Sequence, residues 1–226
     1  MNSHPQPRSR LHGFTLVELL TVIAIIAILM GLLFPVLGII KDKAHNAAAK
    51  TACLGIITAV KAYNTEYGKY PEPRATASST PADAIVGEST GGAGGTVGNE
   101  NLFNTLRAKA VGTNASHALN PRRIVFFEGK DAANTAAPKG GFGSSGAFFD
   151  PWGAQYCVAI DLDYDNQLGT LPYLDFPPAK APQTGCGAYS LGKDGVLGTK
   201  SSSGGTGDKY YKSTGGTPSD DVISWQ

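Results

Sequence analysis

The feature that most constrains this chain is a nearly unbroken apolar run of 22 residues from Leu19 to Ile40. As an α-helix rising 1.5 Å per residue, the run would be about 33 Å long, close to the hydrocarbon thickness of a bilayer. A secretory signal peptide has a shorter apolar core and a small-residue cleavage site after it, so the run predicts a membrane span that is retained. Arg8 and Arg10 precede the span and favour a cytoplasmic N-terminus, although lysines also follow it.

A single carboxylate, Glu18, stands immediately before this run. A carboxylate in the apolar layer is costly unless it reaches the interface or pairs with a cation, and no Lys or Arg lies within a helical turn of it. The partner must therefore come from elsewhere. Cleavage between Gly13 and Phe14 would create an α-amino group four residues before Glu18, and in a bundle of parallel copies the amine of one subunit could meet the Glu18 of another. The alternative is that Glu18 reaches the interface of an uncut anchor.

The run Gly13, Phe14, Thr15, Leu16, Val17, Glu18 resembles the leader junction of type IV pilins and type II secretion pseudopilins. That junction has a short basic leader, Gly before the cut, Phe after it and Glu as the fifth mature residue. The resemblance implies that a prepilin peptidase cleaves after Gly13 and N-methylates Phe14, and that Glu18 is the assembly carboxylate. Residues 1–13 would then be the leader peptide and residues 14–40 the transmembrane and assembly helix.

Pro35 lies inside the predicted span. A proline removes one backbone hydrogen bond and clashes with the carbonyl four residues back, here that of Gly31, which predicts a bend or local unwinding between these two residues. Pilin-like proteins often carry a proline at this position, so the resemblance implies that the break is tolerated. Transmembrane helices in general also contain proline, and Pro35 alone identifies no family.

After Lys41 the apolar residues narrow to one face of a helix. The spacings of this stripe are typical of an amphipathic helix, and its members are Ala49, Ala52, Cys53, Ile56, Val60, Tyr63 and Tyr67. Gly68 and Pro71 end the pattern. We therefore predict one helix from about Thr15 to Tyr67, with residues 41–70 as the amphipathic half of the stalk. The stretch "KAYNTEYGKYPEP" resembles the point at which the stalk helix of major pseudopilins leaves the domain.

Residues 71–226 are predicted to form a globular α+β domain. Residues 72–98 contain few large apolar side chains and indicate a surface loop. Residues 101–110 predict a short helix, and residues 123–129 a strand or an extended edge. The overall expectation is an α+β fold in which a long N-terminal helix packs on a small antiparallel β-sheet, as in the pilin fold.

The "DPWG" turn at Asp150 is followed by an alternating strand, which also resembles the pseudopilin sheet. Asp161, Asp163 and Asp165 imitate the start of an EF-hand loop. Position 6 of that loop requires Gly and position 12 requires Glu, but the chain has Asn166 and Pro172 there, so an EF-hand is rejected. We interpret these aspartates as the solvated face of a strand that runs into a turn. The pattern "GFGSSG" at residues 141–146 is interpreted as a loop.

The C-terminal segments "AYSLGKDGVLG" and "PSDDVISWQ" resemble those that jointly bind calcium in major pseudopilins. The resemblance implies calcium ligands at Asp194, Asp220 and Asp221, with the backbone carbonyls of Leu191 and Val196 completing the set. Calcium takes six to eight oxygen ligands, which suits such a loop. The 24 residues between Gly195 and Asp220 exceed the usual connection in that family, so the alternative is a turn at Asp194 and a cap at Asp220 without a metal.

Three cysteines are present, and no CxxC pair suggests a zinc site. Cys157 and Cys186 could form a disulfide in an exported domain, with the alternative that both are free and buried. His45 and His117 have no neighbouring Asp, Ser or Cys that would suggest a catalytic triad, so we predict no enzyme. The net charge is +1 and no basic stripe alternates with aromatic residues, which argues against nucleic-acid binding.

These observations favour a structural filament subunit that resembles the major pseudopilin of type II secretion. The resemblance implies a single-pass protein of the inner membrane whose C-terminal domain lies in the periplasm. Its partners would be further copies of itself, other pseudopilins, prepilin peptidase and the secretion assembly platform of the inner membrane. A minor pseudopilin or a type IV pilin is the first alternative. A membrane-anchored periplasmic binding domain, whose N-terminus only resembles a pilin, is the second.

Overall fold

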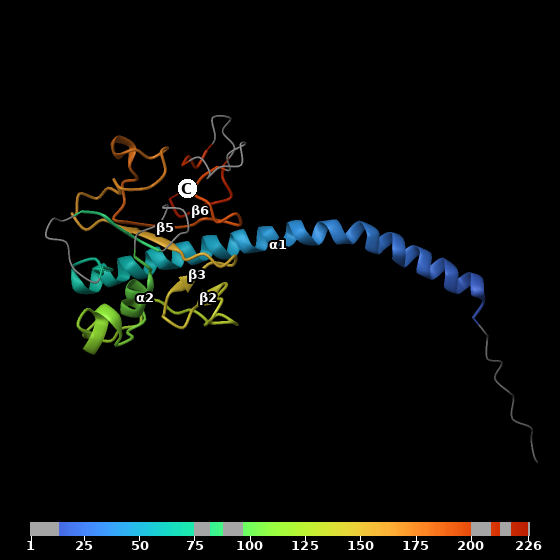
Figure 1. The fold of residues 1–226 in the computed structure, drawn as a ribbon, viewed down its shortest axis with the longest axis horizontal. Helices are drawn as coiled ribbons and strands as arrows, with labels where there is room; N and C mark the ends of the chain where they lie inside the picture. The colour runs from blue at the N-terminus through green and yellow to red at the C-terminus, as the bar shows by residue number, and fades with distance from the viewer. Residues whose placement is uncertain (1–13, 75–81, 88–96, 200–208, 213–217, 226) are drawn as a thin grey trace, which may run out of the picture. The chain divides into compact units, whose positions relative to one another are not determined.

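The structure is a computed structural model, and it describes residues 14–74, 82–87, 97–199, 209–212 and 218–225, with the side chains of residues 34–36 outside that description (Figure 1). The predicted leader, with Gly13, also lies outside the described residues. The chain divides into two compact units, Met1–Ala44 and His45–Gln226. The boundary falls inside the first helix.

Helix α1 runs without interruption from Leu16 to Tyr67, as the sequence predicted. The local unwinding expected between Gly31 and Pro35 is not present, because every residue in that interval is helical. A proline removes one hydrogen bond from the ladder, and the bonds of the flanking turns remain to hold the backbone helical. Of the predicted alternatives, a bend or local unwinding, the unwinding was wrong.

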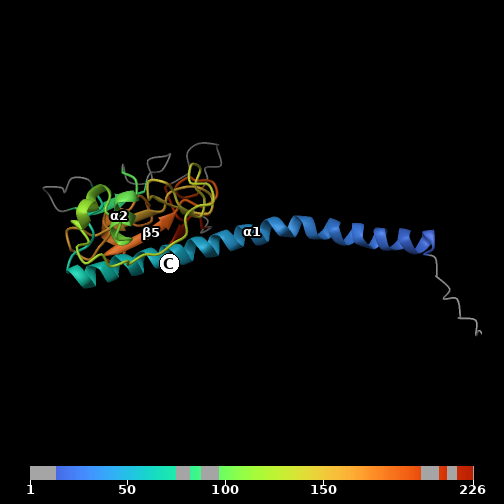
Figure 2. The same ribbon diagram turned by 90° about the horizontal axis from the view of Figure 1, so that it is seen from below.

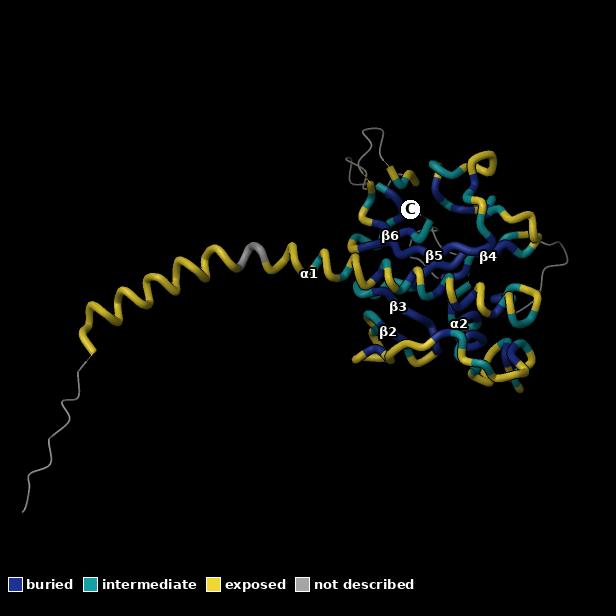
Figure 3. The backbone as a smooth tube through the Cα atoms, turned by 180° about the vertical axis from the view of Figure 1, so that it is seen from behind, coloured by how far each residue is buried: buried dark blue, intermediate teal, exposed yellow. Residues whose placement is uncertain are grey.

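The part of α1 in the first unit is uncovered. Its large apolar side chains from Leu16 to Ile40 are 45 to 79% exposed wherever they are described (Figure 3). They surround the helix on all sides, so they define no single face that a soluble domain could cover. The helix is long and apolar enough to cross a membrane, with a mean hydropathy of 2.9 in its most apolar window. This finding is consistent with a membrane anchor.

The part of α1 in the second unit buries one stripe. Ala49, Cys53, Ile56, Val60 and Tyr63 are all fully buried, and they belong to the predicted amphipathic face. Figure 2 shows this half of the helix lying along one face of the domain. The stripe joins aromatic and aliphatic residues of the sheet and of helix α2 (Glu100–Leu106) in one hydrophobic core. Burial against the domain therefore explains why apolar residues recur here every three or four positions.

Four strands form an antiparallel sheet in the order β1-β4-β5-β6. The strands are β1 (Ala84–Val86), β4 (Cys157–Ile160), β5 (Cys186–Ser190) and β6 (Val222–Ile223). A separate antiparallel pair joins β2 (Gly141–Phe142) to β3 (Phe148–Phe149), and two short 3₁₀ helices, η1 (Gly112–His117) and η2 (Pro178–Lys180), complete the assigned elements. A long helix on a small antiparallel sheet confirms the predicted α+β class.

Two local predictions were wrong, and for a third the structure distinguishes between the two alternatives. The predicted loop at residues 72–98 contains strand β1, which pairs with β4 at the edge of the sheet. Helix α2 ends at Leu106 instead of residue 110, because Ala108 has a left-handed backbone with φ of 54°. Residues 123–129 contain no assigned strand. Phe126 and Phe127 both donate their amides to the Leu106 carbonyl, so that segment caps the end of α2 as an extended edge.

Strand β4 is buried on both faces, whereas the sequence predicted a solvated face. Val158 and Ile160 point into the core under α1, as expected. Cys157 and Ala159 face the other way but are covered by a second layer of loop residues that includes Tyr173, Leu168 and Trp225. That layer comes from segments without regular secondary structure, and a period-2 pattern in the strand carries no information about it.

The "DPWG" turn is confirmed and is held by one buried side chain. Oδ1 of Asp150 accepts the amides of Trp152, Gly153 and Ala154 at 2.7 to 3.0 Å. Its Oδ2 accepts the Ser190 hydroxyl at 2.6 Å. Burial raises the pKa of Asp150, although these donors act in the opposite direction. The turn is thereby joined to the end of β5, beside the C-terminal acidic loop.

Candidate functional site

The N-terminal site begins with a capping interaction. Oε2 of Glu18 accepts the Thr15 amide at 2.8 Å and the Thr15 hydroxyl at 2.7 Å. In return, the Glu18 amide donates to Thr15 Oγ1 at 3.2 Å. These reciprocal bonds form a capping box at the first turn of α1. The pattern Thr15-x-x-Glu18 is a known signature of this motif, and the sequence analysis missed it.

The cationic partner of Glu18 stays a prediction, but the structure adds hydrogen-bond donors that the sequence analysis did not include. Thr15 supplies two donors from within the same turn. Both are neutral, however, and both bind the same oxygen, Oε2. Among the described residues no cation forms an ion pair with Glu18, so its charge remains uncompensated and its second oxygen can accept another donor. Phe14, the first described residue, is 75% exposed beside it.

The C-terminal site lies where β5 ends and β6 begins. These strands are antiparallel neighbours with Ser190 opposite Val222. The loop that follows β5 carries Asp194, and Asp220 and Asp221 immediately precede β6. The sheet register therefore brings the three carboxylates to one end of the sheet, and one oxygen from each lies within 4.8 Å of the others. The sequence predicted this grouping from a resemblance, and the structure brings the residues together.

Asp220 organises the loop around Asp194. Its Oδ2 accepts the amides of Lys193 at 2.8 Å and of Asp194 at 3.1 Å. Gly192 makes this approach feasible, because it has φ of 66° and a Cβ at its position would lie 2.4 Å from the Asp220 carbonyl oxygen. Asp194 in turn accepts the Val196 amide through Oδ1 at 2.9 Å. The predicted backbone ligands Leu191 and Val196 belong to this same loop.

Asp221 is the buried member of the group, with 4% of its surface exposed. Its Oδ2 accepts the Tyr173 hydroxyl at 2.8 Å and the Gly198 amide at 2.7 Å. Its Oδ1 is buried and has no hydrogen-bond partner among the described residues. Burial, with smaller contributions from Asp220 and Asp194, raises the pKa of Asp221 to about 7. A cation bound to this oxygen would supply the missing partner.

A second acidic group lies near the other end of β4. Oxygens of Asp83, Asp161 and Asp163 come within 4.8 Å of one another. Asp161 accepts the amides of Tyr164 and Asn166, so the predicted turn is present. Asp161 itself is buried, whereas the sequence placed it on a solvated face. Asp83, which accepts the Gly169 amide at 2.7 Å, was missed because it is 78 positions away in the sequence.

The candidate disulfide between Cys157 and Cys186 is not formed. All three cysteines are free and buried. Cys157 pairs with Tyr189 and Cys186 pairs with Ile160, so the two cysteines stand at opposite ends of the β4-β5 ladder. Burial raises the pKa of the Cys157 thiol to about 12 and that of Cys186 to about 11, which keeps both protonated.

Comparison with known families gives one match. Residues 8–34 match the model of the prokaryotic N-terminal methylation motif. The matched segment covers the leader junction, Phe14, the Thr15–Glu18 capping box and most of the uncovered part of α1. No curated protein and no solved structure matches the chain.

The N-terminal methylation motif is typical of type IV pilin-like and pseudopilin proteins. The match thus confirms the resemblance drawn from the leader junction. Processing by a prepilin peptidase and assembly into pilus-like polymers are the general properties that this motif indicates.

Proposed function

We propose that this chain is a structural subunit of a periplasmic pseudopilus, resembling the major pseudopilin of type II secretion, and that it supports protein export. One observation carries the proposal. The methylation motif at residues 8–34 coincides with the half of α1 whose apolar side chains are uncovered. Such a surface is satisfied by lipid before assembly and by the helices of neighbouring subunits after it.

Glu18 would direct the assembly step. Cleavage after Gly13 leaves the α-amino group of Phe14 as the cation nearest to Glu18 along the chain. Thr15 occupies one oxygen of Glu18, and the other can accept this ammonium from the same or a neighbouring subunit. A neutralised carboxylate can enter an apolar helix bundle at low cost, whereas an unpaired one cannot. The pairing would therefore fix the axial register of adjacent helices.

The proposed partners follow from this role. The leader would be removed by prepilin peptidase, and the mature chain would be a single-pass inner-membrane protein with its domain in the periplasm. It would polymerise with copies of itself and with other pseudopilins on the secretion assembly platform of the inner membrane. The proposal assigns no catalytic residue and no nucleic-acid contact to the chain.

Mass spectrometry of the protein purified from its native membrane tests the class directly. We expect a mature chain that begins with N-methylated Phe14 in cells with prepilin peptidase, and an uncut chain in cells without it. A Gly13→Val variant should remain uncut in both. A native chain that still begins with Met1 would refute the filament proposal and favour the membrane-anchored binding domain.

We also propose that Asp194, Asp220 and Asp221 bind calcium, with the carbonyls of Leu191 and Val196 as further ligands. The unpartnered buried oxygen of Asp221 and the grouping of the three carboxylates support this proposal. The ion would neutralise three neighbouring carboxylates, one of them buried. Calorimetric titration of the full chain with calcium and, as control, magnesium tests it. Equal weak binding of both ions would argue against a calcium site.

A minor pseudopilin or a type IV pilin remains the alternative within the same class. Type IV pilins more typically carry a C-terminal disulfide loop, and the free Cys157 and Cys186 favour a pseudopilin instead. Subunit counts in isolated filaments distinguish the major from the minor role. A filament composed mainly of this chain supports the proposal, and a chain found only at one end does not.

A further inference from the structure

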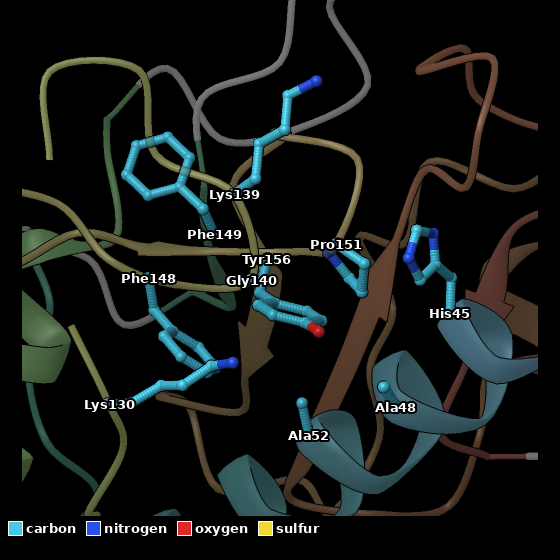
Figure 4. A pocket seen from close by; sticks show the side chains of 10 residues that line it. All are labelled: His45, Ala48, Ala52, Lys130, Lys139, Gly140, Phe148, Phe149, Pro151 and Tyr156. Atoms are coloured by element: carbon cyan, nitrogen blue, oxygen red, sulfur yellow. The ribbon is translucent and has the colours of Figure 1, made fainter. Parts of the chain in front are cut away.

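A cavity in the domain opens beside the first residue of the second unit. It has a volume of about 350 Å³, within the range of small-ligand sites. Its walls come from α1, from the segment around residues 130–140 and from the β3 hairpin with its following turn (Figure 4). The apolar part of the lining consists of Ala48, Ala52, Phe148, Phe149 and Pro151.

The polar side chains of the cavity are cationic or hydrogen-bond donors. Lys130, Lys139 and His45 line it, and no acidic residue does. None of these three forms an ion pair with a described residue. Asp131, which follows Lys130 directly, pairs with Arg107 at 3.6 Å and does not neutralise the cavity. Asp150, the other acidic neighbour of the lining, is buried and already accepts four hydrogen bonds, so the two lysines have no ion-pair partner among the described residues.

Tyr156 provides a preformed donor at the cavity floor. The residue is 2% exposed, yet its hydroxyl makes no hydrogen bond with any described residue. Figure 4 shows the hydroxyl pointing into the space bordered by Ala48, Ala52 and His45. Burial raises the pKa of Tyr156, so it remains a protonated donor. The hydroxyl is therefore available to donate a hydrogen bond to a ligand in the cavity.

The walls are held rigidly, so the site does not have to form on binding. The ring of Tyr156 stacks on Phe148 with centroids 5.0 Å apart. The side chain of Asn99 binds the backbone of both residues, donating to their carbonyls at 2.8 and 2.9 Å. On the opposite side, the rings of His45 and Trp152 pack in a T-shaped arrangement with their centroids 5.7 Å apart.

The place of His45 in the chain indicates where the ligand comes from. Only five positions separate it from Ile40, the last residue of the apolar run, and all of them belong to helix α1. At 1.5 Å per residue this is about 7.5 Å, comparable to the thickness of the headgroup layer outside the hydrocarbon. In a membrane-anchored chain, His45 would therefore stand at the level of the phospholipid headgroups.

We infer that this cavity binds the phosphate of an anionic phospholipid headgroup while the subunit is anchored in the membrane. Lys130 and Lys139 provide the charge, and the His45 ring and the Tyr156 hydroxyl provide directional hydrogen bonds. The inference rests on the proposed membrane anchoring but not on filament formation. Headgroup binding would hold the domain at the membrane surface before assembly, and the phosphate would be released when the subunit leaves the bilayer.

The test uses the full chain in a maltoside detergent, which contains no phosphate, and follows the NMR signals of the His45 and Tyr156 rings. The probes are dihexanoyl-phosphatidylglycerol, inorganic phosphate and acetate. We expect saturable shifts with the short-chain lipid, weaker ones with phosphate and none with acetate. Saturation by acetate at the same concentration would indicate a carboxylate partner, such as a neighbouring subunit, and overturn the inference. Saturation by inorganic phosphate without saturation by the short-chain lipid would show that the cavity binds free phosphate and not a lipid headgroup.

Variants distinguish specific lipid binding in this cavity from nonspecific electrostatic attraction. We expect the double variant Lys130→Gln, Lys139→Gln to weaken lipid binding about 30-fold, from a loss of roughly fivefold per lysine. Tyr156→Phe, which keeps the charge and the stacked ring, should weaken it about fivefold. The control Lys69→Gln, Lys180→Gln removes the same charge from exposed positions and should have no effect. An equal loss in the control, or none in Tyr156→Phe, would refute the assigned site.

Membrane anchoring is checked separately in the same samples. The lysine and tyrosine variants should be cleaved and methylated at Phe14 as the parent chain is. Normal processing together with unchanged lipid binding would refute only the cavity assignment. Absent processing in all variants and in the parent would refute the proposed function instead.

Discussion

The two halves of helix α1 use apolar residues in opposite ways. In the first unit, leucines and isoleucines such as Leu19 and Ile28 are more than half exposed. In the second unit, Ile56 and Tyr63 are fully buried against the domain. Both halves belong to one continuous helix, so helix propensity does not distinguish them. The difference teaches that the distribution of apolar residues around the helix determines what covers it: an all-round apolar surface requires lipid or other subunits, and a single stripe requires its own domain.

The largest expected effect tests the uncovered half. Glu18→Leu should leave the chain in the membrane and cleaved, yet prevent its incorporation into filaments, because the charge that pairs adjacent subunits is lost. Loss of about 1.4 kcal/mol at each contact would already lower the affinity of each added subunit about tenfold. Electron microscopy and crosslinking of filaments, with mass spectrometry of the N-terminus, measure both outcomes.

Glu18→Gln sharpens this test. The amide oxygen of Gln can still accept the Thr15 donors, so the capping box is retained and only the charge is removed. We expect Gln to fail in assembly as Leu does, whereas Thr15→Val, which removes one donor but keeps the charge, should assemble at least partly. Normal filaments from Glu18→Gln would show that Glu18 acts as a helix cap and not as an ion-pair partner.

The second prediction applies one substitution to both halves. Ile56→Ala should lower the free energy of unfolding of the domain by about 3 kcal/mol, because it leaves a cavity in a fully buried site. Ile28→Ala should change it by less than about 0.5 kcal/mol, since its side chain is 65% exposed. Denaturant unfolding of the full chain in detergent measures both. Equal losses would contradict the division of α1 into two functional halves.

Much of this division was visible in the sequence. The length of the apolar run and the three-to-four spacing of the later stripe are local patterns, and they predicted the helix to its last residue. The capping box was equally local, and Thr15-x-x-Glu18 could have revealed it. The absence of unwinding at Pro35 was not predictable in the same way, because it depends on how well the flanking turns tolerate one missing bond.

The domain was less predictable because its contacts are distant in sequence. Strand β1 has three residues, and only its pairing with β4 distinguishes it from a loop. The second face of β4 is covered by loops, and the spacing of apolar residues in the sequence does not indicate where these loops lie. The grouping of Asp194 with Asp220 and Asp221 was expected from a family resemblance alone. The burial of Asp221 under Tyr173, which gives that group its unpartnered oxygen, could be seen only in the structure.

The third prediction concerns what holds the domain onto the buried half of α1. Strand β6 contacts this half directly, since Lys50 Nζ donates to the Ile223 carbonyl at 2.6 Å. If calcium fixes the loop before β6, chelation should lower the Tm of the full chain. An ion at 100 times its Kd contributes about 2.7 kcal/mol, or roughly 5 to 10 °C for a domain of this size. Thermal scans with and without chelator measure the shift.

Two variants assign this effect to the acidic loop. Asp194→Ala should abolish the calcium-dependent part of the Tm, and Asp163→Ala, in the other acidic group, should leave it unchanged. A chelation effect that persists in Asp194→Ala would place the ion elsewhere. No effect in the parent chain would leave the loop as a turn at Asp194 and a cap at Asp220.

The smallest expected effect is a pH dependence that belongs to the domain half alone. Burial, followed by the charges of Asp163, Asp161 and Asp165, raises the pKa of Asp83 above its ordinary value. A carboxyl with a raised pKa in the folded state binds its proton more tightly there than in the unfolded chain. At neutral pH the charged Asp83 lowers the free energy of unfolding of the domain by its full amount. This destabilisation decreases as the pH falls through the raised pKa of Asp83 toward the ordinary value of 3.8.

Asp83→Asn should consequently stabilise the domain by about 0.5 kcal/mol at pH 7 and have no effect near pH 4. Glu128→Gln is the matched control, because Glu128 is exposed and the substitution removes the same charge away from any acidic group. Urea unfolding of the full chain at the two pH values measures the difference. The gain should be the same in a chain that also carries Ile28→Ala, because Ile28 belongs to the other compact unit and its side chain is 65% exposed. If Ile28→Ala changes the stabilisation that Asp83→Asn gives, the two halves of α1 are energetically coupled. The two halves would then differ in solvent exposure but not in their contribution to domain stability.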